Sequence, residues 1–194
     1  MIRFILFSFL LLSLHAHSYE LFQNTNLKCQ MNLGLTNEIL NSNSSTSGST
    51  ASNFSQLEFR PQVVYFLSSD IAVGGYYFQK SLLADFNSFG IGAFIRYYYL
   101  GQGSVIKSKI ENKTTSLAPT FAPYVDLGGK RETLEAETIS VSFSGFEIAT
   151  GVDWHWSHGY FLNLGISLSS QYSGKDRSLF SQTLLLGLGK SLSF

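Results

Sequence analysis

A histidine and a serine stand two residues apart in the run His155-Trp156-Ser157. Alternate residues of an extended strand share a face, and a histidine beside a serine hydroxyl can act as its general base. The flanking Trp154 and Trp156 favour a different role, because tryptophan anchors proteins at a membrane surface. His158 adds a second imidazole, but two histidines without further ligands make no metal site. The run is therefore interpreted as an interfacial anchor, with a catalytic pair as the alternative.

Charged residues recur at positions that alternate with apolar ones, which would place them on one side of a sheet. They are Lys28, Glu58, Arg60, Arg96, Asp126, Glu147 and Asp153. Inside a narrow barrel, such charges must pair or meet trapped water. We therefore predict a salt-bridge network that fills a barrel lumen. A catalytic or ion-conducting role for the same residues is the alternative, and no cofactor or metal is expected.

Eight segments supply the strands that would position these side chains. Each alternates apolar with small or polar residues in period two, and they span 27–35, 54–67, 71–82, 89–100, 120–130, 138–154, 159–170 and 182–194. In the seventh segment, Leu162 and Leu164 face away from Asn163. Each length is near the roughly 9 to 11 residues of a tilted membrane strand. In the sixth, the alternation slips at Ser144-Gly145, which predicts a β-bulge or a late start of the membrane-crossing part.

The amino-terminal residues predict export. Arg3 precedes an apolar run, Phe4 to Leu14, and the small residues of Ala16-His17-Ser18 suit a signal peptidase. We expect a signal peptide at 1–18 and a single barrel domain at 19–194. The lone Cys29 lies too far behind the apolar run for a lipoprotein anchor, and it cannot form an internal disulfide.

Composition limits the class of protein. The chain of 194 residues has 13 Lys plus Arg and 13 Asp plus Glu, and the leader removes only Arg3. The mature chain is thus close to neutral, without the basic footprint of a nucleic-acid-binding protein. No stretch after the leader approaches the roughly 18 apolar residues of a membrane helix. Since only helices and closed barrels span a bilayer, a membrane barrel or a soluble periplasmic β-sandwich is left.

The final segment, QTLLLGLGKSLSF, places Leu184, Leu186 and Leu188 on one face and small or polar residues on the other. A closing strand of this kind that ends on an aromatic is similar to the terminal signature of bacterial outer-membrane β-barrels. The resemblance implies that Phe194 is an assembly signal. It also implies that the barrel-assembly machinery binds this strand.

The stretch from Leu57 to Gly75 carries a second resemblance. It combines an alternating strand that contains Pro61, the pair Tyr65-Phe66, a turn ending at Asp70, and an apolar strand with glycines. This pattern resembles the first hairpin of the OmpA transmembrane domain and of OmpX. The resemblance implies an all-β fold, an eight-stranded antiparallel up-and-down transmembrane β-barrel. It further implies a monomer surrounded by outer-membrane lipid in a Gram-negative cell.

The family resemblance favours a non-enzymatic protein whose function lies in its surface loops or in envelope structure. A narrow, porin-like channel is the first alternative. A lipid-modifying enzyme is the second, because His155-Trp156-Ser157 is similar to the His-x-Ser of the outer-membrane lipid A deacylase barrel. That run falls in a predicted periplasmic turn, however, on the wrong side of the membrane for lipid A.

The predicted connections alternate in length as a barrel with both ends in the periplasm requires. Those at 68–70 and 157–158 are short, and those at 36–53 and 171–181 are longer. Within them, Asn41 to Asn53 predicts a solvated loop because its residues are almost all Ser, Asn, Thr and Gly. The charged run Lys130 to Glu137 predicts a solvated hairpin tip. The connection Gly101 to Pro119 is long where a short turn is expected.

Aromatic residues gather at the predicted periplasmic strand ends, as an interfacial girdle should. They are Tyr65, Phe66, Tyr97, Tyr98, Tyr99, Trp154, Trp156, Tyr160 and Phe194. The general preference of aromatics for strands is the alternative.

Overall fold

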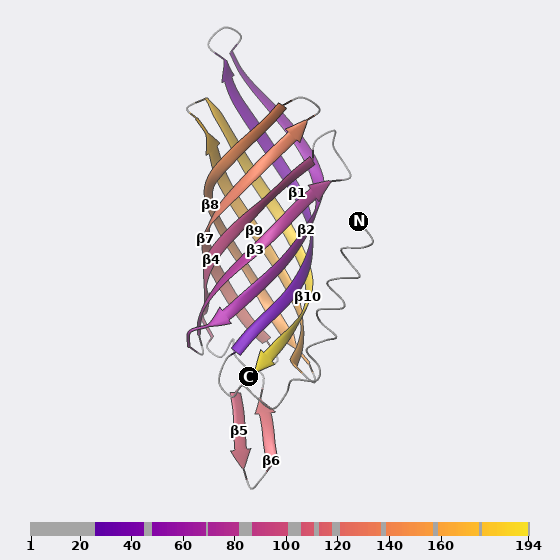
Figure 1. Ribbon diagram of the computed structural model, residues 1–194, viewed down its shortest axis with the longest axis vertical. Coiled ribbons are helices and arrows are strands. Elements are labelled where there is room, and N and C mark those ends of the chain that lie inside the picture. Colours follow the sequence, from indigo (N-terminus) through magenta and orange to yellow (C-terminus); the bar gives the residue numbers. More distant parts are fainter. Residues whose placement is uncertain are drawn as a thin grey trace.

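The computed structural model describes residues 26–44, 48–68, 70–81, 87–100, 106–110, 113–117, 121–136, 139–156, 159–174 and 176–193. Eight strands close into an antiparallel barrel in the order β1-β10-β9-β8-β7-β4-β3-β2, and β5 and β6 form a separate hairpin (Figure 1). The strands are β1 (Asn26–Ser44), β2 (Gly48–Phe66), β3 (Ile71–Ser81), β4 (Asn87–Tyr98), β5 (Ile106–Ile110), β6 (Lys113–Leu117), β7 (Phe121–Ala136), β8 (Ile139–His155), β9 (Tyr160–Ser173) and β10 (Arg177–Ser193).

The predicted eight-stranded barrel is confirmed. The signal peptide predicted at 1–18 and the assembly residue Phe194 lie outside the described residues, so both stay predictions. No helix in the described ranges is long and apolar enough to cross a membrane.

The barrel has two different ends. Asn26 pairs with Ser193, so β1 begins and β10 finishes at one end, which we call the terminal end. At the opposite, distal end, the β1–β2 hairpin rises farther than the other strands, and the β5–β6 hairpin hangs beyond the terminal end (Figure 1). The long connection Gly101 to Pro119 therefore contains a β-hairpin, paired from Ile106–Leu117 to Ile110–Lys113.

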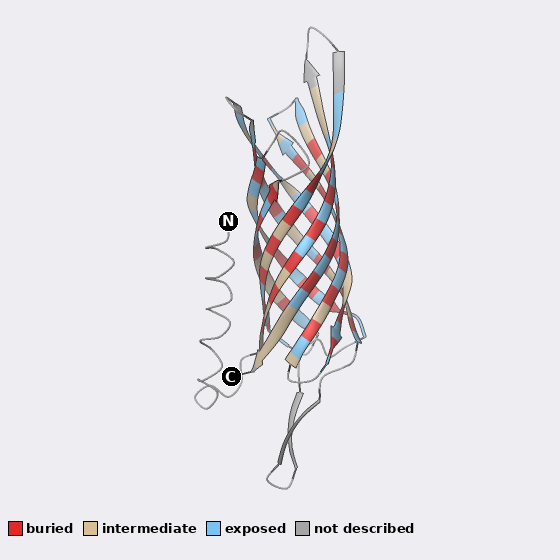
Figure 2. Ribbon diagram, turned by 90° about the vertical axis from the view of Figure 1, so that its right-hand side faces the viewer, coloured by how far each residue is buried: buried red, intermediate tan, exposed pale blue. Residues whose placement is uncertain are grey.

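Burial alternates residue by residue along the barrel strands (Figure 2). On β9 and β10, Leu164, Leu186 and Leu188 are 49 to 60% exposed on the outer wall, whereas Asn163 and Ser167 are buried inside. The faces predicted for these two strands are confirmed. A row of outward leucines around a closed sheet is the arrangement that a lipid environment stabilises.

Three predicted loops are wrong, because strands continue through them. The hairpin tip predicted at Lys130 to Glu137 is strand as far as Ala136, with Lys130 and Glu132 buried. Asn41 to Asn53 is largely a ladder in which Asn41 pairs with Ala51 and Ser42 with Thr50. The segment 171–181 is also mostly strand, with Arg177 paired to Ser173 across a tight turn that contains Gly174 at a φ of 67°. The backbone hydrogen bonds of a ladder form between polar residues as well as between apolar ones. The polar composition therefore indicates where the strands extend beyond the lipid, and not where they end.

Of the two explanations given for the slip at Ser144-Gly145, a β-bulge or a late start of the membrane-crossing part, the β-bulge is wrong. Pairs between β7 and β8 run without interruption from Ala136–Ile139 to Phe121–Trp154. Phe143 points inward and is 1% exposed, while Phe146 points outward and is 78% exposed. The backbone keeps its period, and the apolar side chains change faces because the distal part of the lumen is itself apolar.

The aromatic girdle is confirmed in part. Six of the predicted residues lie exposed on the outer wall: Tyr65, Tyr97, Tyr99, Trp154, Trp156 and Tyr160. Phe66 and Tyr98 do not, because they alternate with these neighbours and point into the lumen, where they stack at a centroid distance of 5.5 Å.

Candidate functional site

The candidate site is the lumen, which is filled by charged side chains. The structure places all seven charged residues named from the sequence inside the barrel and in ion pairs. It adds four buried charges that the sequence analysis did not assign to the lumen: Glu38, Lys80, Lys130 and Glu132. The eleven groups form two clusters.

The terminal cluster consists of Lys28, Arg96, Asp126 and Asp153. The Arg96 guanidinium donates from Nε and Nη2 to the two oxygens of Asp126, at 2.7 and 2.8 Å. Lys28 Nζ lies 2.8 Å from Asp153 Oδ2, and Arg96 Nη1 lies 3.8 Å from the same oxygen. Two cations thus meet two carboxylates, and the cluster is balanced.

Aromatic and amide side chains enclose the terminal cluster. The Tyr98 hydroxyl donates to Asp153 Oδ2 at 2.9 Å, and Asn163 donates to Asp153 Oδ1 at 2.8 Å. The Arg96 guanidinium carbon lies 3.5 Å from the centroid of the Tyr124 ring. Both Asp153 oxygens therefore have partners, and the cations rest against aromatic faces that attract them.

The distal cluster begins in the middle of the lumen. Arg60 donates to Glu58 at 2.5 Å and holds Glu147 with two nitrogens, at 3.0 and 3.3 Å. Lys130 Nζ lies 4.0 Å from Glu147 and 3.1 Å from Glu132. The ion pairs thus form a continuous chain towards the distal end.

Lys80 completes the distal cluster by bridging two carboxylates. Its Nζ donates to Glu38 Oε1 and, at 2.5 Å, to Glu132 Oε1. Ser88 and Gln171 donate to Glu132 at 2.8 and 3.1 Å. All of these side chains are buried.

An apolar cap lies beyond the distal cluster. It consists of the buried Leu134, Phe143 and Leu179, and three partly buried residues pack against it: Leu40, Phe54 and Val141. On each of β1, β7 and β10, the cap residue stands two positions beyond Glu38, Glu132 or Ser181 on the same strand. The cap therefore separates the charges from the distal mouth.

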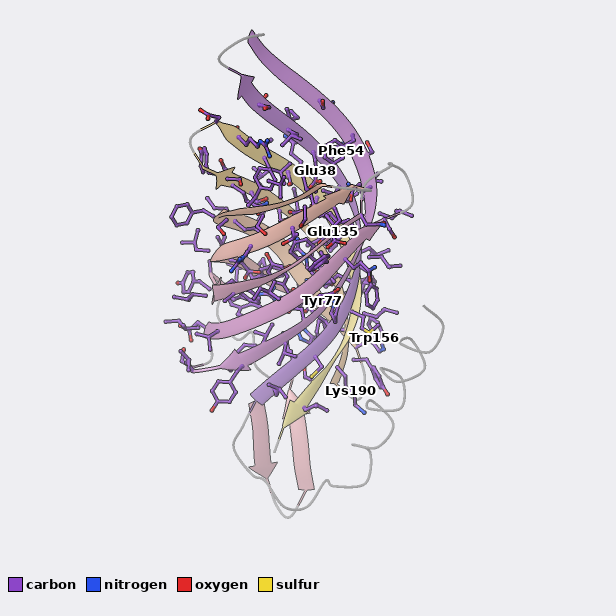
Figure 3. The ribbon with its side chains drawn as sticks, turned by 45° about the horizontal axis from the view of Figure 1, so that its top comes forward. Glu38, Phe54, Tyr77, Glu135, Trp156 and Lys190 are labelled. Carbon is purple, nitrogen blue, oxygen red and sulfur yellow. The ribbon has the colours of Figure 1, made fainter. Side chains whose placement is uncertain are left out.

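Only His155 and Trp156 of the run His155-Trp156-Ser157 are described, so a catalytic pair of His155 and Ser157 stays untested. His155 ends β8 and points inward, with its ring centroid 5.4 Å from that of Phe161. Trp156 is exposed and lies towards the terminal end with Lys190, whereas Glu38 and Phe54 lie towards the distal end (Figure 3). Ser157 and His158 lie outside the described residues. Among the residues that are described, no group of three or more His, Cys, Asp or Glu could hold a metal ion.

Comparisons with known proteins identify the fold. No protein-family model and no curated protein match the chain. Among solved structures, it is similar to Neisserial surface protein A, with a TM-score of 0.58 and 15% identity over 87% of this chain and 99% of that one. It is also similar to the outer membrane protein OprG from Pseudomonas aeruginosa, with a TM-score of 0.54 and 13% identity over 89% and 98% of the two chains. The chain has the fold of a small outer-membrane β-barrel.

The likeness to these two structures shows the fold, and the outward leucines suit a barrel wall that faces lipid. An outer-membrane barrel of this size can be an enzyme, a channel or an anchor, because unrelated functions share one fold. The choice among them rests on the lumen and on the barrel ends.

Proposed function

We propose that this protein is a closed, non-enzymatic outer-membrane barrel that anchors the β1–β2 hairpin at the cell surface. The observation that carries the proposal is the filled lumen. Each of the eleven charged side chains is at most 10% exposed. The apolar cap covers them at the distal end.

A paired lumen resists opening. Removal of one partner from a buried ion pair costs about 3 to 5 kcal/mol, and a water path past Arg60 or Lys80 would separate several pairs at once. The interior of an eight-stranded barrel leaves little room for water beside these side chains. The lumen therefore supports the barrel wall and does not conduct.

The β1–β2 hairpin supports a role at the surface. Its ladder continues through Asn43–Ser49 and Ser44–Gly48, beyond the last β10 pair at Ser42–Arg177 and the last β3 pair at Leu57–Ser81. Both β1 and β10 have their free chain ends at the terminal end, and the barrels that the sequence resembles keep both chain ends in the periplasm, so we orient the distal end outward. The chain would sit as a monomer in outer-membrane lipid, after assembly guided by the closing strand and Phe194.

Two measurements on proteoliposomes test the closed, non-enzymatic role. The refolded barrel should leave an entrapped small-ion indicator unchanged, and lipid mass spectra should be identical before and after incubation. Ion flux through wild-type protein would establish a channel, and a new lipid mass would establish a lipid-modifying enzyme. Folded protein is verified in the same sample by its shifted mobility on unheated gels.

Deletion of residues 43–49 tests the surface role. The shortened protein should remain heat-modifiable. Whole cells that carry it should lose the binding to a ligand that cells with the wild-type protein show. Equal binding by both cell types would locate the surface function elsewhere.

A narrow channel is the second candidate, because two cations have alternative partners. Arg60 lies between Glu58 and Glu147, and Lys130 lies between Glu132 and Glu147. Exchange of partners could open a path, and the flux of the Arg60→Ala variant would then differ from that of wild type.

A further inference from the structure

The distal cluster contains more carboxylates than cations. Its cations are Arg60, Lys80 and Lys130, and its carboxylates are Glu38, Glu58, Glu132 and Glu147. The terminal cluster is balanced. Fully ionised, the distal cluster would therefore carry one uncompensated negative charge inside a membrane, which is strongly unfavourable.

The hydrogen bonds identify the carboxylate that bears the excess. Glu132 and Glu147 have partners on both oxygens. Glu58 receives Arg60 on Oε1 and Thr36 on Oε2. Glu38 Oε1 accepts from Lys80 and from Ser181, but Glu38 Oε2 is fully enclosed and has no hydrogen-bond partner among the described residues.

A second incomplete group lies beside Glu38. Gln56 is 0% exposed, and neither atom of its carboxamide has a hydrogen-bond partner in the part of the chain that the structure describes. Gln56 pairs across the ladder with Thr36, and Glu38 pairs with Phe54. Gln56 and Glu38 are thus diagonal neighbours on the inner face of adjacent strands, within reach of long side chains.

We propose that the distal cluster is a proton-binding site in which Glu38 holds a proton on Oε2 at neutral pH and donates it towards the Gln56 carboxamide oxygen. One proton balances the cluster and gives a partner to Glu38 Oε2 and to the Gln56 carboxamide oxygen. The described residues offer no cluster of three metal ligands, so a proton fits better than a metal ion. The charged groups that face Glu38 are Lys80 on β3, and Lys130 and Glu132 on β7.

Infrared spectroscopy of the full-length barrel in bilayers tests the proposal directly. At neutral pH, wild type should show the carbonyl stretch of a protonated carboxylic acid, which is distinct from the carboxylate bands. Glu38→Gln should lose this band. The matched control, Glu135→Gln, removes an exposed carboxylate of β7 and should keep it (Figure 3).

A second variant separates protonation from folding. Gln56→Lys places an amino group beside Glu38 that can take up the proton, and it should abolish the band while the heat-modifiable gel mobility is kept. Absence of the band in folded wild type, or its persistence in Glu38→Gln, would overturn the proposal. A band that appears only after sodium and potassium are removed would assign the site to a metal ion and would also overturn it.

Discussion

The two clusters in the lumen contain the same kinds of charged residue but differ in charge balance and in the residues that surround them. The terminal cluster pairs two cations with two carboxylates and surrounds them with Tyr98, Tyr124 and Asn163. The distal cluster sets three cations against four carboxylates beneath an apolar cap. The difference shows that the ion pairs of a buried network can form a continuous chain although its charges do not balance. The terminal cluster is suited to rigid support, and the distal cluster to binding one more positive charge.

The largest effect is expected from Arg96→Ala in the balanced cluster. The change leaves Asp126 without its two guanidinium hydrogen bonds and should cost about 3 to 5 kcal/mol. The measurement is the urea midpoint of the folded gel band in lipid. Arg131→Ala, at an exposed position of β7, should change stability by no more than about 0.5 kcal/mol. Equal losses in the two variants would mean that the terminal cluster does not support the wall.

The cap should come next. Phe143→Ala removes a buried ring from the cap and should cost about 3 kcal/mol. Phe146→Ala, three residues along the same strand, removes an outward ring and should have a smaller effect on urea stability. A larger loss of urea stability for Phe146→Ala would indicate that Phe146, and not Phe143, points inward. It would then favour a β-bulge at Ser144-Gly145.

The smallest effect is expected where a carboxylate is already neutral. Asp126→Asn removes the charge that Arg96 requires and should cost about 1 to 3 kcal/mol. Glu38→Gln imitates a protonated carboxyl group and should cost less than about 1 kcal/mol. Both are read from the same urea midpoint. If Glu38→Gln proved the more harmful, the contrast between the clusters would be lost.

Alternation in the sequence predicted the inner face correctly wherever the outer face meets lipid. Lys28, Arg60 and Arg96 were assigned inward because their neighbours on the strand are apolar. Glu38 and Glu132 were missed, because each was placed in a loop or hairpin tip where that apolar row stops. The spacing could have identified them, because residues an even number apart on one strand share a face. Glu38 lies an even number of residues from Lys28, and Glu132 from Asp126.

The pairing within the lumen could not be predicted in the same way. Lys28 and Asp153 are 125 positions apart in the chain, and Arg60 and Glu147 are 87 apart. Their contacts depend on the register of strands that are distant in the sequence. The balance of each cluster follows only from those contacts, so it became visible with the structure.

The proposed function requires a lumen that is closed. Single-channel recording of the full-length barrel in planar bilayers tests this directly, with insertion verified by gel mobility of protein recovered from the same membrane. We predict a flat current at both polarities, because the paired clusters and the apolar cap leave no path for ions. Discrete current steps from folded wild-type protein would contradict the account.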